Sequence, residues 1–200
     1  MWDERYDRPD YLFGTKPALG LLRQEPHLIS QGKSLLIADG EGRNSVYLAK
    51  QGFDITAMDS SKIGMDKAKK LAKDTGVDIQ FQLADIYDYD WSAMAYDNVM
   101  AIFIQFAPPQ SWTAIFNGMK QAVREGGIIF IHGYTRQQIH YGTGGPSNVD
   151  HLYEPEMLEE AFADFEIITN EAYEADVDDG PGHNGRSALL DFIARKPVTN

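Results

Sequence analysis

Apolar positions along the chain follow two alternating patterns. Short apolar runs bounded by turn residues alternate with segments in which apolar residues recur every three or four positions. The first pattern is typical of buried strands and the second of amphipathic helices. The apolar runs predict strands at 34–38, 54–58, 78–83, 98–104 and 128–132. The helical spacing predicts helices at 44–51, 62–74 and 109–123, the second with Ser60 and Ser61 available as caps and Gly76 beyond its end.

The end of the chain follows a different pattern. Residues 165–175 and 188–195 are predicted strands joined by the polar loop 176–187, with no helix between them. Alternating strands and helices predict a parallel sheet, whereas two strands joined directly predict an antiparallel hairpin. We therefore predict an α/β fold, Rossmann-like and doubly wound, with a mostly parallel seven-stranded sheet that ends in an antiparallel hairpin. A length of 200 residues suits one domain over 1–200.

Composition and charge narrow the class of partner. The chain is 43% hydrophobic and 24% charged, with a net charge of −12 and scattered basic residues. Nucleic acids and anionic membranes require a basic face, so neither is expected as a partner. No apolar run approaches the ~18 residues that span a bilayer, and the N-terminus is charged, which predicts a cytoplasmic protein. The absence of cysteine excludes disulfides, thiolate metal sites and a cysteine nucleophile.

A glycine turn follows the first predicted strand. Gly40, Gly42 and Ser45 partly match the G-x-G-x-x-G pattern of nucleotide-binding folds. Asp59 lies about 20 residues after Asp39, at the end of the second strand, where an acid accepts hydrogen bonds from ribose hydroxyls. In a parallel sheet, ligands bind at the carboxyl ends of the strands. These features predict a nucleotide-like ligand.

The charge of this turn distinguishes between ligands. The pyrophosphate of a dinucleotide would lie near Asp39 and Glu41 and be repelled by them. S-adenosylmethionine carries a positive sulfonium and a positive amino group, which carboxylates attract. After the third strand, Asp85 is placed to accept from an adenine amino group and Ile86 to pack on the ring. The alternatives are a nicotinamide-dependent oxidoreductase and a non-catalytic module that binds S-adenosylmethionine or another nucleoside.

Four segments, in this order, resemble the class I S-adenosylmethionine-dependent methyltransferases: IADGEGRNSVYLAKQGFDITAMDSS, LADIYDY, YDNVMAIF and REGGIIFIHGY. Within that superfamily the chain is similar to the small group that includes tellurite-resistance and thiopurine-type methyltransferases. The resemblance covers a catalytic core at 32–196, and WDERYDRPDYLFGTKPALGLL resembles the N-terminal capping segment, here 1–30. It implies methyl transfer from S-adenosyl-L-methionine to a small-molecule acceptor such as a thiol, a chalcogen oxyanion or another small nucleophile.

The resemblance, together with the strand ends, gives the expected cofactor contacts. The family usually has an acid two residues before its first glycine, but Leu36 and Ala38 occupy these positions here. Asp39 or Glu41 can supply the missing charge, and the sequence does not decide between them. Gly40 and Gly42 are expected to let the backbone approach the methionine part. The predicted cofactor-binding residues are Ala38, Asp39, Gly40, Gly42, Asn44, Asp59, Ser60, Asp85, Ile86 and Ile102.

Candidate catalytic and acceptor-binding residues lie after the later strands. His132 and Tyr134 end the fifth strand, and His183 lies in the tail loop, so each is a candidate for contact with the acceptor or as a base. The glycine-rich loop 137–153 is long enough to form a lid. The N-terminal aromatic residues either close over the sulfonium or pack an amphipathic helix on the body. The predicted acceptor contacts are Tyr11, Phe13, Phe106, His140, Tyr141 and Arg186.

Two further expectations concern metals and assembly. Asp178, Asp179 and His183 lie on a glycine loop without the helical or hairpin spacing of a metal site, so no metal is predicted. Either a monomer or a homodimer is compatible with this sequence.

Overall fold

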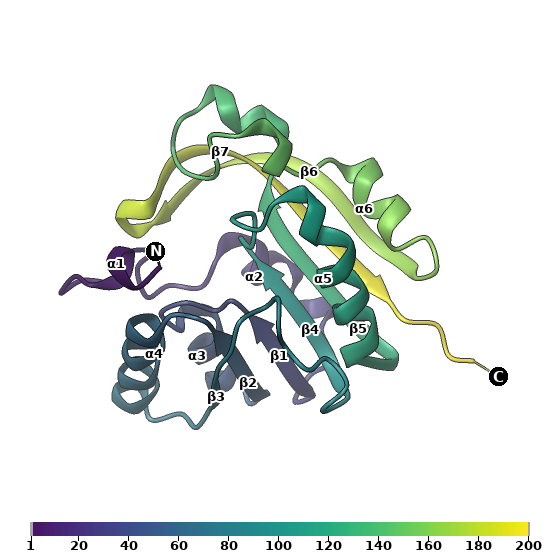
Figure 1. Cartoon of the computed structure of the whole chain (residues 1–200), viewed down its shortest axis with the longest axis horizontal. Helices are drawn as coiled ribbons and strands as arrows, with labels where there is room; N and C mark the ends of the chain where they lie inside the picture. Colours follow the sequence, from purple (N-terminus) through teal and green to yellow (C-terminus); the bar gives the residue numbers. More distant parts are fainter. Residues whose placement is uncertain (1, 200) are drawn as a thin grey trace.

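The computed structural model describes residues 2–199 and contains one seven-stranded sheet, with strand order β3-β2-β1-β4-β5-β7-β6 (Figure 1). All neighbouring pairs are parallel except those that β7 makes with β5 and β6. This topology confirms the predicted fold class. The strands are β1 (Lys33–Ile37), β2 (Asp54–Asp59), β3 (Gln80–Leu83), β4 (Tyr96–Ile102), β5 (Val123–Tyr134), β6 (Glu166–Asp179) and β7 (His183–Arg195).

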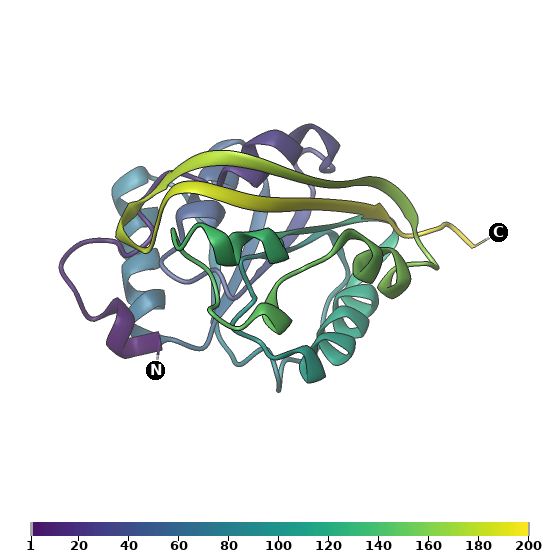
Figure 2. The ribbon, with the colours of Figure 1, turned by 90° about the horizontal axis from the view of Figure 1, so that it is seen from above.

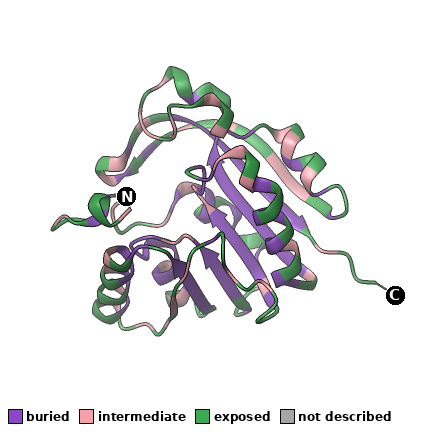
Figure 3. Cartoon of the chain, viewed as in Figure 1, coloured by how far each residue is buried: buried purple, intermediate pink, exposed green. Residues whose placement is uncertain are grey.

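Helices cover both faces of the sheet. On β1, Leu35 and Ile37 pack in the core beneath α5 (Pro109–Ala122) and α6 (Pro155–Ala161), whereas Leu36 packs on the opposite side with α2 (Leu19–Gln24) and α3 (Arg43–Lys50). Successive side chains of a strand point to opposite faces, which produces these two cores. The buried strands between exposed helix surfaces are visible in Figure 3. The remaining regular elements are α1 (Trp2–Tyr6), α4 (Lys62–Thr75) and four short 3₁₀ turns, η1 (Glu25–His27), η2 (Arg136–His140), η3 (Val149–His151) and η4 (Gly180–Gly182).

The predicted ends of α4 are confirmed. The Ser61 hydroxyl accepts a hydrogen bond from the backbone N–H of Gly64, and Gly76 ends the helix in the left-handed conformation. The predicted start of the fifth strand at residue 128 was wrong. The helix α5 ends at Ala122 and β5 begins at the next residue, so Gly126 and Gly127 lie inside an irregular start of this strand. The helices α2 and α6 are too short, at six and seven residues, for a periodic signal.

The tail loop predicted at 176–187 was also wrong. The two last strands continue into it, and Asp179 pairs with His183 across a connection of only three residues. The prediction failed because β6 is an edge strand whose exposed side chains within 176–179, Asp176 and Asp178, are polar, so the composition of this part resembles that of a loop.

The hairpin formed by β6 and β7 places its tip beside the N-terminal segment, as both views show (Figures 1 and 2). The backbone N–H of Gly182 donates to the carbonyl of Leu12 at 2.9 Å, and the rings of Phe13 and His183 lie 4.5 Å apart. Two segments from opposite ends of the chain therefore meet above the carboxyl ends of the strands. No helix among residues 2–199 is long and apolar enough to cross a membrane.

Candidate active site

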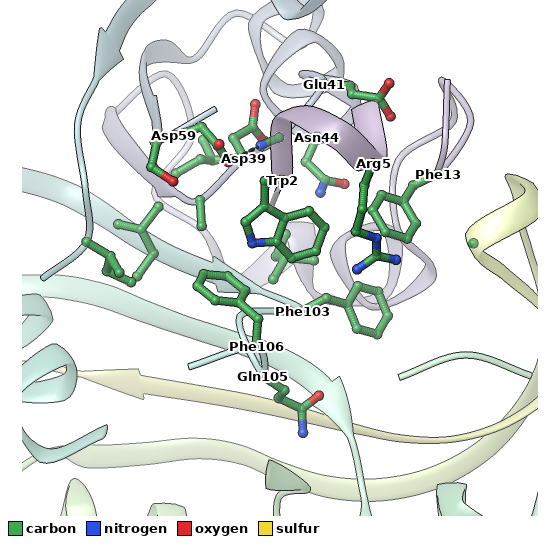
Figure 4. Close-up of a pocket in the computed structure, with 18 of the residues that line it drawn as sticks. Trp2, Arg5, Phe13, Asp39, Glu41, Asn44, Asp59, Phe103, Gln105 and Phe106 are labelled. Atoms are coloured by element: carbon green, nitrogen blue, oxygen red, sulfur yellow. Dashed lines mark hydrogen bonds between the residues drawn. The ribbon is translucent and has the colours of Figure 1, made fainter. Parts of the chain in front are cut away.

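A cavity of about 710 Å³ lies at the carboxyl ends of β1, β2 and β4. Its volume falls within the ~300–1,000 Å³ typical of small-molecule sites. Four segments enclose it, namely the glycine turn after β1, the N-terminal segment, the loop after β5 and the hairpin tip. They contribute, among other residues, Asp39, Asn44, Trp2, Phe13, Gly144, Pro146 and His183. The close-up in Figure 4 shows Asp39 and Asp59 near each other on one side, with Trp2, Phe103 and Phe106 across from them.

Asp39, rather than Glu41, is the turn acid whose charge is available to the cavity. Its Oδ2 accepts from the Ser45 hydroxyl at 2.5 Å, while its buried Oδ1 has no hydrogen-bond partner. Glu41 points away from the cavity in Figure 4 and forms an ion pair with Lys67 and a hydrogen bond with the backbone N–H of Leu12. Both acids line the cavity, but only Asp39 has a buried oxygen without a hydrogen bond or an ion pair.

Burial and the nearby charge of Asp59 raise the pKa of Asp39 to about 7, against the opposing effect of the Ser45 hydrogen bond. A cation beside the unpartnered oxygen would stabilise the ionised form. Asp39 forms no ion pair with any residue between 2 and 199, and Arg43, whose charge lowers the pKa of Asp39, is itself paired with Asp179. This site fits a ligand that carries a positive charge.

Asp59 ends β2 and connects it to two backbone segments. Its Oδ2 accepts from the N–H of Gly40 at 2.8 Å, and its Oδ1 accepts from the N–H of Ser61 at 2.7 Å. Each carboxylate oxygen has a second lone pair, which leaves acceptor capacity for ligand hydroxyls. Burial raises the pKa of Asp59, against the effect of these two N–H donors.

The two glycines of the turn serve protein packing. A Cβ at Gly40 would approach the Tyr6 hydroxyl to 2.6 Å, and a Cβ at Gly42 would approach the Cβ of Ala68 to 2.8 Å. Both glycines also have positive φ, at 63° and 88°. The absence of a side chain at Gly40 allows α1 to pack closely, and its absence at Gly42 allows α4 to do so. Gly42 does not line the cavity. The expected cofactor contact is therefore corrected for Gly42, whereas Gly40 lines the cavity and its contact with the cofactor stays a prediction.

The other predicted cofactor contacts all line the cavity. Asp85 is exposed and Ile86 is buried just after β3, as expected for one polar and one apolar contact with an adenine ring. The Oδ1 of Asn44 accepts a hydrogen bond from the backbone N–H of Ala18. The side-chain NH₂ group of Asn44 can therefore donate to a ligand. The remaining members of this set are Ala38, Ser60 and Ile102.

An aromatic end of the cavity lies beyond β4 and β5. The centre of the Phe103 ring lies 4.7 Å from that of His183 and 4.8 Å from that of Tyr134. The backbone of Phe103 has a positive φ of 55°. The Nδ1 of His183 and the hydroxyl of Tyr134 are buried and have no hydrogen-bond partner. Two polar atoms are therefore available to a ligand in an otherwise apolar environment.

The imidazole of His183 is neutral at physiological pH. Burial, together with the positive charges of Arg43 and Arg5, lowers its pKa to about 3. Burial and the charge of Asp179 raise the pKa of Tyr134, so its phenol keeps its proton. This end of the cavity thus offers two neutral hydrogen-bonding groups.

His132 does not reach the cavity, which corrects its prediction as a catalytic residue. Its side chain is 1% exposed, and its Nδ1 lies 2.7 Å from the Oδ1 of Asp191. The ring of Phe103 packs 4.6 Å from His132 and separates it from His183. His132 and Tyr134 are two positions apart and so share a face of β5, but Phe103 packs against both rings, and only Tyr134, one strand position further on, lines the cavity as predicted.

Four predicted acceptor contacts also lie elsewhere, whereas Phe13 and Phe106 line the cavity. Tyr11 lies over Lys67, with its ring 5.1 Å from Nζ, in a separate surface hollow. His140 is exposed, and Tyr141 hydrogen-bonds to Glu174, which also pairs with Arg186 at 3.0 Å. Local sequence did not indicate that these side chains face outward. Between residues 2 and 199, no three His, Asp or Glu side chains group as metal ligands.

Several lining residues were not predicted. Phe103 and Gln105 follow β4, and the rule that ligands bind at the carboxyl ends of strands was a sufficient signal for both. Residues 144–148 lie in the loop 137–153, whose length suggested a lid, and Arg5 lies in the segment that resembles a cap. The sequence indicated these segments but did not single out these positions within them.

Comparison with known proteins identifies the domain type. Residues 35–127 match the family model described as "Methyltransferase domain". The tRNA (uracil(54)-C(5))-methyltransferase of Pyrococcus abyssi is 30% identical over 105 residues, which are 48% of this chain and 25% of that protein. The chain therefore spans about a quarter of the length of this curated relative.

Solved structures share the fold at low identity. TehB from Haemophilus influenzae aligns with a TM-score of 0.70 and 21% identity, over 88% of this chain and 61% of TehB. A protein described for the conversion of a disulfide bond into a thioacetal group during echinomycin biosynthesis aligns with a TM-score of 0.81 and 17% identity, over 100% of this chain and 91% of that one.

The matched segment, the strand order and the acidic glycine turn agree with one another. The segment 35–127 begins in β1 and includes the turn, Asp59, Asp85 and β4, which form the cofactor side of the cavity. The unpartnered carboxylate of Asp39 and the acceptor capacity of Asp59 fit a cationic nucleoside. Residues 35–127 thus match a methyltransferase domain, and the charges of the site fit S-adenosylmethionine as the cofactor.

Proposed function

We propose that this protein transfers the methyl group of S-adenosylmethionine to a small molecule held between Phe103, Tyr134 and His183. When bound, the cofactor supplies a methyl group that is already activated by its sulfonium. The protein needs chiefly to hold an acceptor in line and close, an effect worth up to ~7–11 kcal/mol in well-oriented reactions. The carboxylates Asp39 and Asp59 and the residues after β3 would hold the cofactor at the other end of the cavity.

The observation that carries this proposal is the pair of carboxylates on one side of the cavity. Asp59 is buried, Asp39 is half-buried with a buried Oδ1, and neither forms an ion pair with any other described residue. Two like charges 4 Å apart cost about 4 kcal/mol at an effective dielectric constant of 20. Repulsion of this size between Asp39 and a pyrophosphate would weaken the binding of a nicotinamide dinucleotide.

The enclosure of the aromatic end supports a small acceptor. Phe13, residues 144–148 and His183 close it from three sides. The net charge of −12 also disfavours tRNA, the substrate named for the Pyrococcus relative. His183 would accept a hydrogen bond at Nδ1 from the acceptor and so orient its nucleophilic atom, because a neutral imidazole is an acceptor at one nitrogen.

Two measurements test the proposal. Calorimetric titration with S-adenosylmethionine, S-adenosylhomocysteine and NADH should show binding of the first two, and binding of NADH alone would contradict it. Turnover of labelled S-adenosylmethionine should then be measured with thiols, tellurite, selenite, amines, phenols and unmodified tRNA. Turnover of any small molecule supports the proposal. Methylation of tRNA alone, or cofactor binding without any turnover, would favour a nucleic-acid enzyme or a non-catalytic module, respectively.

A further inference from the structure

Arg5 is the arginine whose charge is not neutralised within the described chain. Its guanidinium carbon lies 4.5 Å from the ring centre of Trp2 and 5.9 Å from that of Phe13, and it lines the cavity. Figure 4 shows the guanidinium between the ring of Phe13 and that of Trp2. It forms no hydrogen bond or ion pair among residues 2–199. By contrast, every other arginine pairs with at least one carboxylate: Arg8, Arg23, Arg43, Arg124, Arg136, Arg186 and Arg195.

No carboxylate that lines the cavity forms an ion pair with Arg5 among residues 2–199, including those of Asp39 and Asp85. Glu41 is engaged by Lys67, and Asp179 is engaged by the buried Arg43 at 3.0 Å. Asp59 accepts two backbone N–H groups on the opposite side. The aromatic rings stabilise a cation over their faces but leave the N–H donors at the edge of the guanidinium unused. Planar guanidinium donors match the two oxygens of a carboxylate.

We propose that Arg5 is an anion receptor, which binds a carboxylate or another oxyanion of a ligand in this cavity. The inference rests on the proposed function and deepens it, because it gives α1 a recognition role. The charge of Arg5 reaches the aromatic end, where it contributes to the lowered pKa of His183. Asn44, whose amide N–H group is free to donate, lines the same cavity and is a second donor for such an anion.

Two ligand groups have this chemistry. One is the methionine carboxylate of the cofactor, and the other is an acidic group on the methyl acceptor. Both would place a negative charge beside an unpaired guanidinium. The two sources are distinguished by removing the carboxylate from one ligand at a time.

The variant for the test is Arg5→Gln, with Arg5→Lys to retain the charge. Arg8→Gln is the matched control, because Arg8 lies in the same segment, pairs with Asp10 at 2.6 Å and does not line the cavity. Dissociation constants are measured by calorimetry for S-adenosylhomocysteine and for 5′-methylthioadenosine, which lacks the amino-acid part. Benzoate and benzamide are then titrated into the protein with and without S-adenosylhomocysteine.

If the cofactor supplies the anion, Arg5→Gln raises the dissociation constant of S-adenosylhomocysteine at least about tenfold and leaves that of 5′-methylthioadenosine unchanged. If the acceptor supplies it, the wild type binds benzoate more tightly than benzamide, and Arg5→Gln loses that preference. Arg5→Lys should retain part of either effect and Arg8→Gln should show neither. The inference is overturned if Arg5→Gln alters neither comparison, or weakens both nucleosides equally. Failure of the wild type to bind S-adenosylhomocysteine would instead contradict the proposed function, and the benzoate titration without cofactor would still test Arg5.

Discussion

The carboxylate of Asp59 accepts a hydrogen bond from the backbone N–H of Gly40, with 2.8 Å between Oδ2 and N. One side chain at the end of β2 thereby holds the turn that follows β1, across 19 residues of sequence. The same carboxylate lines the cavity. Positioning of the turn and recognition of the ligand thus depend on one residue.

Replacement of Asp59 tests its role as the ribose ligand. Asp59→Ala should weaken S-adenosylhomocysteine binding at least about tenfold, because hydrogen bonds to a charged group contribute ~1.5–3 kcal/mol. Calorimetry measures the change. Asp88→Ala is the control, since Asp88 is exposed and outside the cavity, and it should bind as the wild type does. Unchanged affinity in Asp59→Ala would count against the assignment.

Cofactor affinity should depend on pH through Asp39. The pKa of this group is about 7 in the ligand-free protein, and a cationic ligand binds its ionised form more strongly. Affinity for S-adenosylmethionine should therefore rise between about pH 6 and 8. In Asp39→Asn the affinity should be lower and this rise should disappear. Calorimetry across that range measures both, and an identical pH profile in the variant would refute the role of Asp39.

The stability of the ligand-free protein should depend on pH in the opposite direction from the cofactor affinity. An aspartate has a pKa near 3.9 when unfolded, so between about pH 4 and 7 the folded state binds more protons at Asp39 than the unfolded state does. Its contribution to stability therefore falls as the pH rises through that window. Asp39→Asn should be more stable than the wild type at pH 8, with a difference that shrinks toward pH 4. Urea unfolding at both pH values measures this, and a less stable variant at pH 8 would contradict it.

A side chain at Gly42 should destabilise the fold through its contact with α4, and this loss of stability can be separated from backbone strain. Gly42→Ala brings a methyl group against Ala68 at a positive φ, so it should lose ~1–3 kcal/mol for overpacking in addition to the strain. Gly76→Ala is the matched control, because its φ is 75° and no atom lies within 4 Å of the new Cβ. Urea unfolding should show the larger loss for Gly42→Ala. Equal losses would mean that contact with Ala68 is unimportant.

Asp191 should stabilise the fold without contacting the ligand. It is 0% exposed and accepts from Arg23, Gln24 and Tyr173 in addition to His132. Asp191→Asn replaces an acceptor oxygen with a donor and should cost ~1–3 kcal/mol, because a buried donor is then left without a partner. Glu171→Gln is the control, since Glu171 pairs with the same Arg23 at the surface and should cost less than about 1 kcal/mol. Equal losses in urea unfolding would show that burial of the network is unimportant.

The sequence by itself determined the fold class and the cofactor side of the site. Apolar periodicity is a local property, so it predicted the alternation of strands and helices from which the sheet follows. The cofactor side could be predicted because Asp39, Asp59 and Asp85 each lie just after a strand, and parallel strands bring their carboxyl ends to one edge. Strand order in the parallel part of the sheet then placed these residues together.

Only the tertiary structure decided the acceptor side. His132 and Tyr134 end the same strand, but the packing of Phe103 places one behind the cavity and the other within it. Glu41 and Asp39 are two residues apart, and contact with Lys67 turns Glu41 away. Arg5 and His183 come from opposite ends of the chain and meet because the hairpin tip bonds to the N-terminal segment. Such contacts depend on residues far apart in sequence, so no local pattern encodes them.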